Sequence, residues 1–222
     1  RTGAGLARAA TRAAHIPPLL ARRPECMATA VDHRNHLLPL LDWPSAVVIG
    51  PGLGQAPWGE QMLHGVLASD LPLLVDADAL NLLASDARPL PDGSIITPHP
   101  GEAARLLGCR SADIQADRFA AATSLAQRFN AVVVLKGQGT IVAKADQSML
   151  CAAGNPGMAS GGMGDVLSGI LGSLLAQGLS AWDAACLGTL LHSEAADRAA
   201  AEHGMAALLA SDLFPALAEL LP

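Results

Sequence analysis

Short apolar runs alternate with longer stretches of helical spacing through the first two thirds of the chain. Four runs without polar alternation are bounded by Gly, Pro or Asp: Ala46–Gly50, Leu73–Asp78, Ser94–Pro98 and Val132–Gly137. Such runs suit strands of a parallel sheet that is covered on both faces. Three segments between them have helical spacing: Gln55–Asp70, Gly101–Leu107 and Asp113–Asn130. The alternation predicts βαβ units.

The third helical segment places Ile114, Phe119, Leu125 and Phe129 broadly on one side. After Lys136 the pattern changes. Two short runs joined by a polar turn, Thr140–Lys144 and Ser148–Ala152, predict a β-hairpin. From Ser160 the chain is almost entirely helical, with Gly178 and Gly204 as helix stops and Ser211 as the expected cap of the last helix.

Composition supports one α/β domain spanning residues 1–222. The chain has 222 residues, 51% hydrophobic and 15% charged, which is enough to bury a large core. Its net charge of -6 argues against nucleic acid as a partner. The uncharged stretch Val166–Trp182 is short for a membrane span and contains Gly, Ser and Gln, so we expect a buried helix and the turn that follows it.

The four cysteines are far apart: Cys26, Cys109, Cys151 and Cys186. They form no Cys-x-x-Cys motif and no Cys/His cluster, so neither a disulfide scaffold nor a zinc site is indicated. Reduced core thiols in a cytoplasmic protein are the simpler interpretation.

The strongest chemical signal is the glycine-rich segment Asn155–Gly164, which leads directly into an apolar helix. Glycines allow successive backbone N–H groups to converge on a ligand, and the start of the helix adds partial positive charge. This pattern predicts an anion hole for phosphates, although a tight structural loop is the alternative. Asp165 follows in the first helical turn, where an ionised carboxylate could take the proton of a hydroxyl that attacks phosphorus. An acid that merely favours the helix start is the competing interpretation.

Further polar segments follow the predicted strands. The turn Gly50–Gly54 and the segments Asp76–Asn81, Thr97–Gly108 and Leu135–Thr140 all belong to one edge of the sheet if the strands are parallel. Alone, His99 is more often structural and Lys136 is more often simply solvated. Because acids and two glycine turns are expected at the same edge of the sheet, we favour a ligand-binding site there. No P-loop motif is present, and Gly50–Gly54 lacks the spacing of a Rossmann dehydrogenase.

In order along the chain, the segments GPGLG, DADALN, TPHPGEAARLLG, VLKGQGT, NPGMASGGMGDVLSG and ASDL resemble the ADP-dependent NAD(P)H-hydrate dehydratases of the ribokinase-like superfamily. The resemblance covers essentially the whole chain and implies a three-layer α/β/α fold with a mostly parallel central sheet. It also implies repair of NADH hydrate and NADPH hydrate: ADP phosphorylates the ring hydroxyl, and elimination of phosphate leaves NAD(P)H, AMP and inorganic phosphate.

The same resemblance assigns site residues. Asp165 matches the catalytic base. One ADP-binding loop comprises Lys136, Gly137, Gln138, Gly139 and Thr140. The ADP-binding stretch with the anion hole comprises Asn155, Pro156, Gly157, Met158, Ala159, Ser160, Gly161, Gly162, Met163 and Gly164. Positions expected to receive the hydrated dinucleotide are Gly52, Gly54, His99, Pro100, Gly101, Glu102, Ala103, Ala104, Arg105 and Asp165.

Family resemblance further implies Mg²⁺ as a cofactor, with Glu102 near the metal without binding it directly. A homo-oligomer and an epimerase domain fused upstream are the expected partners. Members of the family begin with an apolar strand and a glycine-rich turn, and then reach the segment seen here as Arg1–Leu6, so we expect this domain to be incomplete at its N-terminus. Leu6–Thr11 is the next expected strand. Activity of these residues alone is therefore open.

Two alternatives remain from the residues themselves. A sugar or vitamin kinase of the same superfamily would share the base and the anion hole, although Thr97–Ala103 and Asp76–Asn81 favour the dehydratase. An inactive nucleotide-binding module is the other alternative, and the expected loss of the first strand gives it weight.

Overall fold

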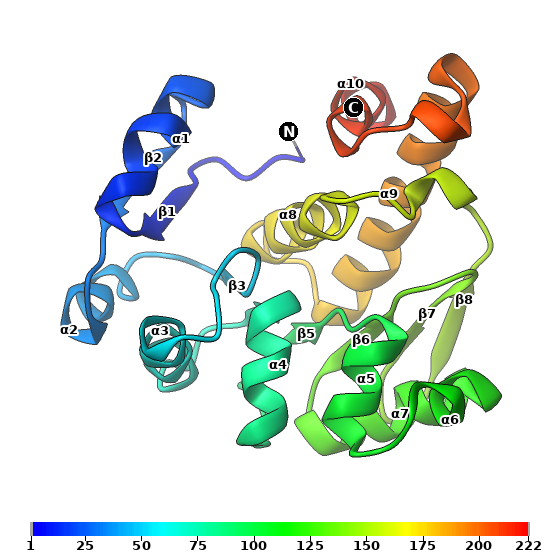
Figure 1. Ribbon diagram of the computed structural model, residues 1–222, viewed down its shortest axis with the longest axis horizontal. Helices are drawn as coiled ribbons and strands as arrows, with labels where there is room; N and C mark the ends of the chain where they lie inside the picture. Colours follow the sequence, from blue (N-terminus) through cyan, green and yellow to red (C-terminus); the bar gives the residue numbers. More distant parts are fainter. Residues whose placement is uncertain (1, 222) are drawn as a thin grey trace.

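A computed structural model describes residues 2–221 of the chain. Its main sheet has six strands in the order β3-β4-β5-β6-β7-β8 (Figure 1). The strands are β3 (Val47–Ile49), β4 (Leu73–Val75), β5 (Ile95–Ile96), β6 (Val132–Leu135), β7 (Thr140–Ala143) and β8 (Ser148–Cys151). The first four are parallel, and β7 and β8 continue the sheet as an antiparallel hairpin. The predicted parallel core and hairpin are both confirmed.

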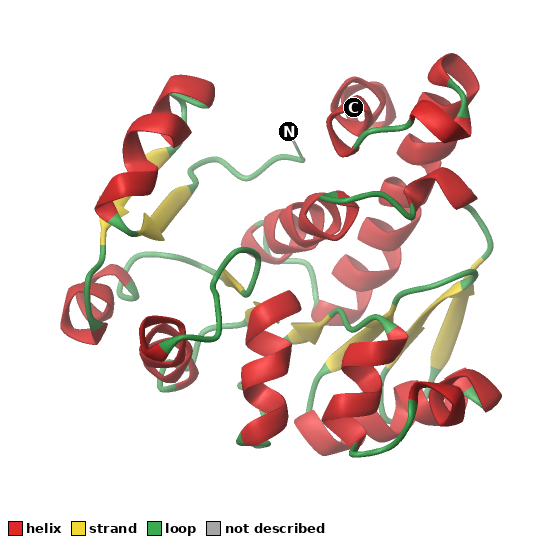
Figure 2. Cartoon of the chain, viewed as in Figure 1, coloured by secondary structure: helices red, strands yellow, loops and turns green. Residues whose placement is uncertain are grey.

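Helices cover both faces of this sheet, as Figure 2 shows. The helices between the strands are α3 (Pro57–Leu67), α4 (Ala77–Ser85), α5 (Pro100–Leu107), α6 (Ser111–Ala116) and α7 (Arg118–Phe129). Those near the C-terminus are α8 (Met163–Ala176), α9 (Ala181–His203) and α10 (Leu213–Leu220). Short 3₁₀ turns are η1 (Ala13–His15), η2 (Leu38–Leu40), η3 (Pro156–Met158), η4 (Met205–Ala207) and η5 (Ala210–Asp212).

Alternating side chains of the strands divide the core in two. Val133 and Leu135 of β6 pack in the cluster that includes α3, α4, α5 and α7. Val132 and Val134 of the same strand pack in the cluster that includes α8, α9 and α10. Because successive residues of a strand point to opposite faces, a strand covered on both sides must be apolar throughout. The result is the expected three-layer α/β/α architecture.

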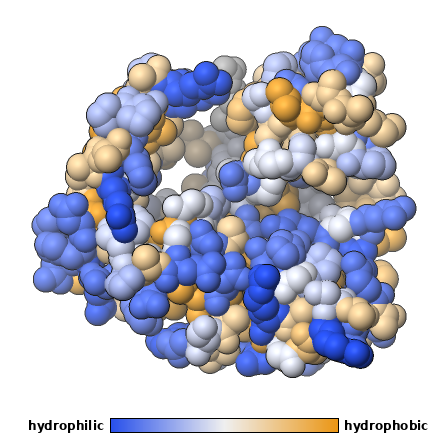
Figure 3. All heavy atoms as spheres, in the orientation of Figure 1, coloured by the Kyte–Doolittle hydropathy of each residue, from blue (hydrophilic) through white to orange (hydrophobic). Residues whose placement is uncertain are grey.

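The N-terminal part forms a separate two-stranded parallel sheet. It comprises β1 (Arg8–Thr11) and β2 (Met27–Ala30), with α1 (Ile16–Arg22) between them and α2 (Arg34–Leu37) after them. Trp58 on α3 donates from Nε1 to the Val31 carbonyl at 2.8 Å, and the Arg12 guanidinium lies 5.0 Å from the Trp58 ring centroid. Figure 3 shows the surface hollowed between this unit and the helices near the C-terminus. The expected strand in Leu6–Thr11 is confirmed from Arg8 onward.

Three predictions about elements were wrong. Asp113–Asn130 is two helices, because Asp117 has a non-helical conformation (φ -148°, ψ 87°) and its side chain caps α7. The new helical phase leaves Phe119 46% exposed, although Ile114, Leu125 and Phe129 are buried as expected. Leu73–Asp78 is a strand only to Val75, since α4 begins at Ala77. Ser211 makes no capping hydrogen bond to α10 and lies inside η5.

Two glycines show how backbone spacing shapes the edge of the sheet. Gly50, which follows β3, has φ +128°, and a Cβ atom there would lie 1.7 Å from the Asp76 carbonyl oxygen. Only glycine lets these two strand ends approach so closely. In contrast, Gly169 is an exposed residue inside α8, and a Cβ atom there would meet nothing within 4 Å.

We predict opposite effects of alanine at these two positions. Gly50→Ala should lower the free energy of unfolding by about 2–4 kcal/mol, because the backbone must shift to remove the clash. Gly169→Ala should raise it by roughly 0.5–1 kcal/mol, because alanine favours the helix. Urea denaturation of both variants measures the effects. An unchanged denaturation midpoint for Gly50→Ala would contradict the close approach described here.

Candidate active site

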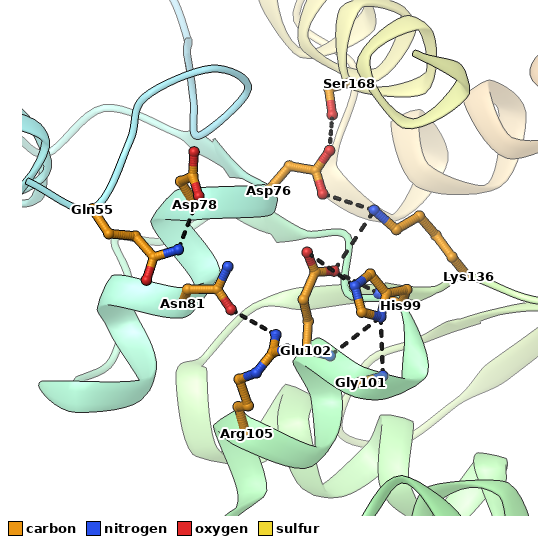
Figure 4. Close-up of polar contacts among 10 residues, drawn as sticks. All are labelled: Gln55, Asp76, Asp78, Asn81, His99, Gly101, Glu102, Arg105, Lys136 and Ser168. Atoms are coloured by element: carbon orange, nitrogen blue, oxygen red, sulfur yellow. Dashed lines mark hydrogen bonds and ion pairs between the residues drawn. The ribbon is translucent and has the colours of Figure 1, made fainter. Parts of the chain in front are cut away.

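The chemistry-bearing side chains gather where parallel strands end. Asp76 follows β4, Lys136 follows β6, and the segment after β5 leads through His99 into α5. Because parallel strands present their carboxyl ends at the same edge, these three segments meet there. Figure 4 shows their side chains converging between α4, α5 and α8. The predicted convergence on one edge of the sheet is confirmed.

A buried ion pair forms the centre of this cluster. Lys136 Nζ lies 2.8 Å from Asp76 Oδ1, and Asp76 is 1% exposed. The other carboxylate oxygen, Oδ2, accepts a hydrogen bond of 2.7 Å from the Ser168 hydroxyl. Asp76 therefore links β4, β6 and α8, with both of its oxygens occupied. A carboxylate buried this deeply needs such partners, because desolvation strongly disfavours its charge.

Glu102 is the second buried carboxylate of the cluster. Its Oε2 accepts a hydrogen bond of 2.8 Å from the backbone amide of His99 and lies 3.8 Å from Lys136 Nζ. The His99 ring in turn caps α5, with Nδ1 accepting from the amide of Gly101 at 3.0 Å. This reciprocal capping box explains why TPHPGE has a histidine and an acid three residues apart. Both side chains thus have structural partners here.

Asp165 lies in the first turn of α8, as predicted. Partial desolvation raises the pKa of its carboxyl above the usual range, although the residue is exposed; the negative charge of Asp76 raises this pKa further, and the positive charge of Lys136 opposes both. The preceding Gly164 lies against the ion pair, since a Cβ atom there would be 3.6 Å from Lys136 Nζ and 3.7 Å from Asp76 Oδ2. The end of the glycine-rich segment and the charged cluster are therefore one site.

The start of the glycine-rich segment is held by a different set of contacts. The Asn155 side chain donates from Nδ2 to Asp197 Oδ1 on α9 at 2.8 Å and accepts from the amide of Gly157 at 3.0 Å. The Gly154 amide donates to the other oxygen of Asp197, also at 2.8 Å. Asp197 thus anchors this loop to α9. Toward the helix, Gly162 has φ +87°, and a Cβ atom on Gly161 would meet no atom within 4 Å.

The turn after β3 is attached to α4. The Gly54 amide donates to Asp78 Oδ2 at 2.9 Å, and Gln55 Nε2 donates to Asp78 Oδ1 at 3.1 Å. A Cβ atom on Gly52 would meet no atom within 4 Å, so the backbone of this turn is open to a ligand. Arg105 on α5 donates to the Asn81 side chain at 2.8 Å. Its described hydrogen bond is therefore to α4 rather than to the ion pair.

Sequence reasoning missed several residues that hold this site together. Asp76 and Ser168 were inside quoted motifs without an assigned role, and Asp197 was not singled out at all. His192 on α9 was also missed: it is 7% exposed, and burial lowers its pKa to about 4 while a hydrogen bond with the Met163 backbone acts in the opposite direction. Among residues 2–221 its Nε2 has no hydrogen-bond partner. A buried polar side chain inside an apolar helix was the only available signal.

Comparison with protein families matches residues 1–219 to the model of the NAD(P)H-hydrate dehydratase family. The chain belongs to this family. An ADP-dependent (S)-NAD(P)H-hydrate dehydratase of Neisseria meningitidis is 45% identical over 207 residues, which cover 89% of this chain and 69% of that protein. A bifunctional NAD(P)H-hydrate repair enzyme of Coxiella burnetii is 52% identical over 218 residues. That match covers 98% of this chain but only 44% of the relative's length.

Solved structures agree with this assignment. An ADP/ATP-dependent NAD(P)H-hydrate dehydratase from Bacillus subtilis, co-crystallised with ATP and Mg²⁺, has a TM-score of 0.85 and 30% sequence identity. The alignment covers 99% of this chain and 79% of that one. The ribokinase-like fold and the family expected from the motifs are therefore confirmed. None of the helices among residues 2–221 is both long and apolar enough to cross a membrane.

The cluster around Asp76 makes a direct prediction for this chain. Asp76→Asn should lower the pKa of Asp165, because it removes a like charge and also frees Lys136 from its partner. Titration of the Asp165 carboxyl carbon by NMR measures the change. Asp78→Asn is the matched control, since Asp78 binds the turn after β3 instead. Equal Asp165 titration in the wild type and Asp76→Asn would show that the two carboxylates do not interact.

Proposed function

We propose that this chain catalyses the ADP-dependent dehydration of NADH hydrate and NADPH hydrate. Support comes from family membership together with the position of Asp165, beside a glycine-rich segment and the partly buried Lys136 at the same sheet edge. The relative from Neisseria meningitidis is named for ADP dependence and for this substrate. The proposed chemistry rests on one observation: an acid, Asp165, lies in the first turn of α8, directly after the glycine-rich segment.

The proposed reaction has two steps. In the first, the hydroxyl on the hydrated nicotinamide ring attacks the β-phosphorus of ADP, the bond to the bridging oxygen breaks, and AMP leaves. Asp165 accepts the hydroxyl proton as the new P–O bond forms. In the second, the ring loses a proton from the neighbouring carbon, and the C–O bond breaks with its electrons leaving on phosphate. The products are NAD(P)H, AMP and inorganic phosphate.

A raised pKa suits Asp165 for this role. Base strength increases with pKa, so a carboxylate whose pKa is raised by desolvation and by a neighbouring acid takes a proton more readily than an ordinary aspartate. The group must still be ionised before it can act. Activity should therefore be lost on acidification at a higher pH than for an aspartate with an ordinary pKa.

The remaining predicted residues have complementary roles in this proposal. Backbone amides of Asn155–Gly164 and the loop Lys136–Thr140 bind the nucleotide phosphates, helped by the start of α8. The open turn containing Gly52 and Gly54, and the segment His99–Arg105, receive the hydrated dinucleotide. Lys136 Nζ lies 2.8 Å from Asp76 Oδ1 and 3.8 Å from Glu102 Oε2, so its positive charge offsets the negative charge of these two carboxylates beside the phosphates.

Magnesium would enter this site together with the nucleotide. Among residues 2–221, no group of three or more His, Cys, Asp or Glu side chains is arranged to hold a metal ion. Phosphate oxygens of ADP would supply ligands, and Glu102, which lies 3.8 Å from Lys136 Nζ, would be an acid of this chain held near the ion. Bound Mg²⁺ would neutralise phosphate charge in a site that already has three acidic side chains. The Bacillus subtilis enzyme was crystallised with ATP and Mg²⁺.

The assay that tests this function follows recovery of reduced nicotinamide absorbance from NADH hydrate plus ADP. One AMP and one phosphate should appear for each NADH formed. A small-molecule kinase would instead accumulate a phosphorylated alcohol and regenerate no NADH from the hydrate. Absence of NADH recovery would contradict the proposed function for this chain.

Asp165→Asn should reduce kcat by about 10²–10⁴-fold, because the amide cannot accept the proton. Affinity for ADP should stay within a few-fold, which calorimetry can measure. Asp146→Asn is the control, since Asp146 is exposed in the turn between β7 and β8. Wild-type kcat in Asp165→Asn would remove Asp165 as the base, and loss of ADP binding would show a structural role instead.

A further inference from the structure

In the loop between β6 and β7, the backbone carbonyls accept hydrogen bonds from side chains, whereas most of the backbone amides are unpaired among the residues that the structure describes. Arg118, the first residue of α7, donates from Nη1 to the Gln138 carbonyl at 2.5 Å. Its Nη2 lies 3.2 Å from the Leu135 carbonyl oxygen and 3.4 Å from that of Lys136. The Gly137 carbonyl accepts from the Thr140 hydroxyl at 3.3 Å. Side chains therefore occupy four successive carbonyls.

The amides of the same loop are free of such partners. Lys136 donates its amide to the Pro98 carbonyl at 2.9 Å, but within the described part of the chain the amides of Gly137, Gln138 and Gly139 have no acceptor. Gly137 and Gly139 have φ of +144° and +64°, values that favour glycine. A loop whose carbonyls are tied back and whose amides are unpaired is suited to an anion.

Arg118 brings positive charge to this loop without a carboxylate partner. Across residues 2–221 it forms no ion pair, unlike Arg110, which is paired with Asp113. Its Nε is buried and unpartnered, and burial lowers the pKa of the guanidinium. An arginine remains charged despite such a shift. Only a planar group with several donors can reach three carbonyls of one turn at once.

Gly137 is closely fitted to this arginine. A Cβ atom on Gly137 would lie 3.0 Å from Arg118 Nη2, so any side chain there would push the guanidinium away. The motif KGQGT therefore depends on a residue 18 positions earlier in the chain. No sequence pattern indicates this dependence, because Arg118 lies inside the segment Asp113–Asn130, which is predicted to be one helix.

We propose that Arg118 is a positioning residue for the nucleotide loop, tying back its carbonyls so that the amides of Gly137–Gly139 face the phosphates of ADP. The inference rests on the proposed function, since it takes ADP as the ligand. It adds a residue that no sequence motif assigned to the site. The contribution is geometric: three hydrogen bonds fix the loop before the nucleotide arrives, which reduces the ordering cost of binding.

Calorimetry with ADP tests this role through two variants. Arg118→Met should weaken ADP binding by about 10-fold or more, because the loop loses all three bonds. Arg118→Lys keeps the charge but cannot reach three carbonyls, so it should restore affinity only in part. Steady-state kinetics should show a raised KM for ADP, with kcat and the KM for NADH hydrate within about two-fold of wild type. Arg128→Met, near the other end of α7, is the matched control and should match wild type.

Three results with these variants would overturn the proposal. Unchanged ADP affinity in Arg118→Met would show that the hydrogen bonds of Arg118 do not affect nucleotide binding. Wild-type ADP affinity in Arg118→Lys would show that only the positive charge matters. Equal weakening of ADP and NADH hydrate would indicate a general loss of structure. If Arg118→Met does not fold, Arg118→Lys decides by the same criteria. Wild-type protein that binds ADP but forms no NADH would refute the proposed function and leave this inference standing; failure to bind ADP would refute both.

Discussion

The buried ion pair between Asp76 and Lys136 is the interaction on which the site depends. Asp76 follows β4 and Lys136 follows β6, so their contact of 2.8 Å fixes the ends of two strands that are separated by β5. The second oxygen of Asp76 binds Ser168, one turn beyond Asp165 on α8. Removal of either partner would leave an unpaired charge in a desolvated place, which proteins tolerate poorly. Asp76 therefore fixes the ends of β4 and β6 relative to the start of α8, where the proposed base Asp165 lies.

This arrangement also determines the charge of the site. Three carboxylates, Asp76, Glu102 and Asp165, lie around one lysine, and partial desolvation together with the charge of Asp76 raises the pKa of Asp165. Asp76 and Glu102 are both buried and both hydrogen-bonded, whereas Asp165 is exposed at the glycine-rich segment. The two buried acids therefore support the lysine and the backbone, and the exposed acid is free to exchange a proton with a substrate. Environment, rather than residue type, separates their roles.

Much of the fold followed from patterns that are local in sequence. Apolar runs without alternation indicated parallel strands covered on both faces, and the glycine-rich segment before an apolar helix located Asp165. What failed depended on conformations or contacts that no local pattern encodes. Asp117 breaks a stretch of continuous helical spacing because its side chain caps a new helix. Asp76 was assigned to a strand end, although its partners lie 60 and 92 residues away. Only the folded topology brings them together.

Transfer of the phosphoryl group to the ring hydroxyl is the central chemical claim, and an oxygen label tests it most directly. NADH hydrate with ¹⁸O in the ring hydroxyl is incubated with the wild-type protein and ADP, and the released inorganic phosphate is analysed by mass spectrometry. Because the hydroxyl oxygen becomes the bridging oxygen of the intermediate and leaves with phosphorus, the account predicts one ¹⁸O atom in each phosphate. Unlabelled phosphate, with the label in water, would show direct dehydration beside separate ADP hydrolysis and would contradict the mechanism.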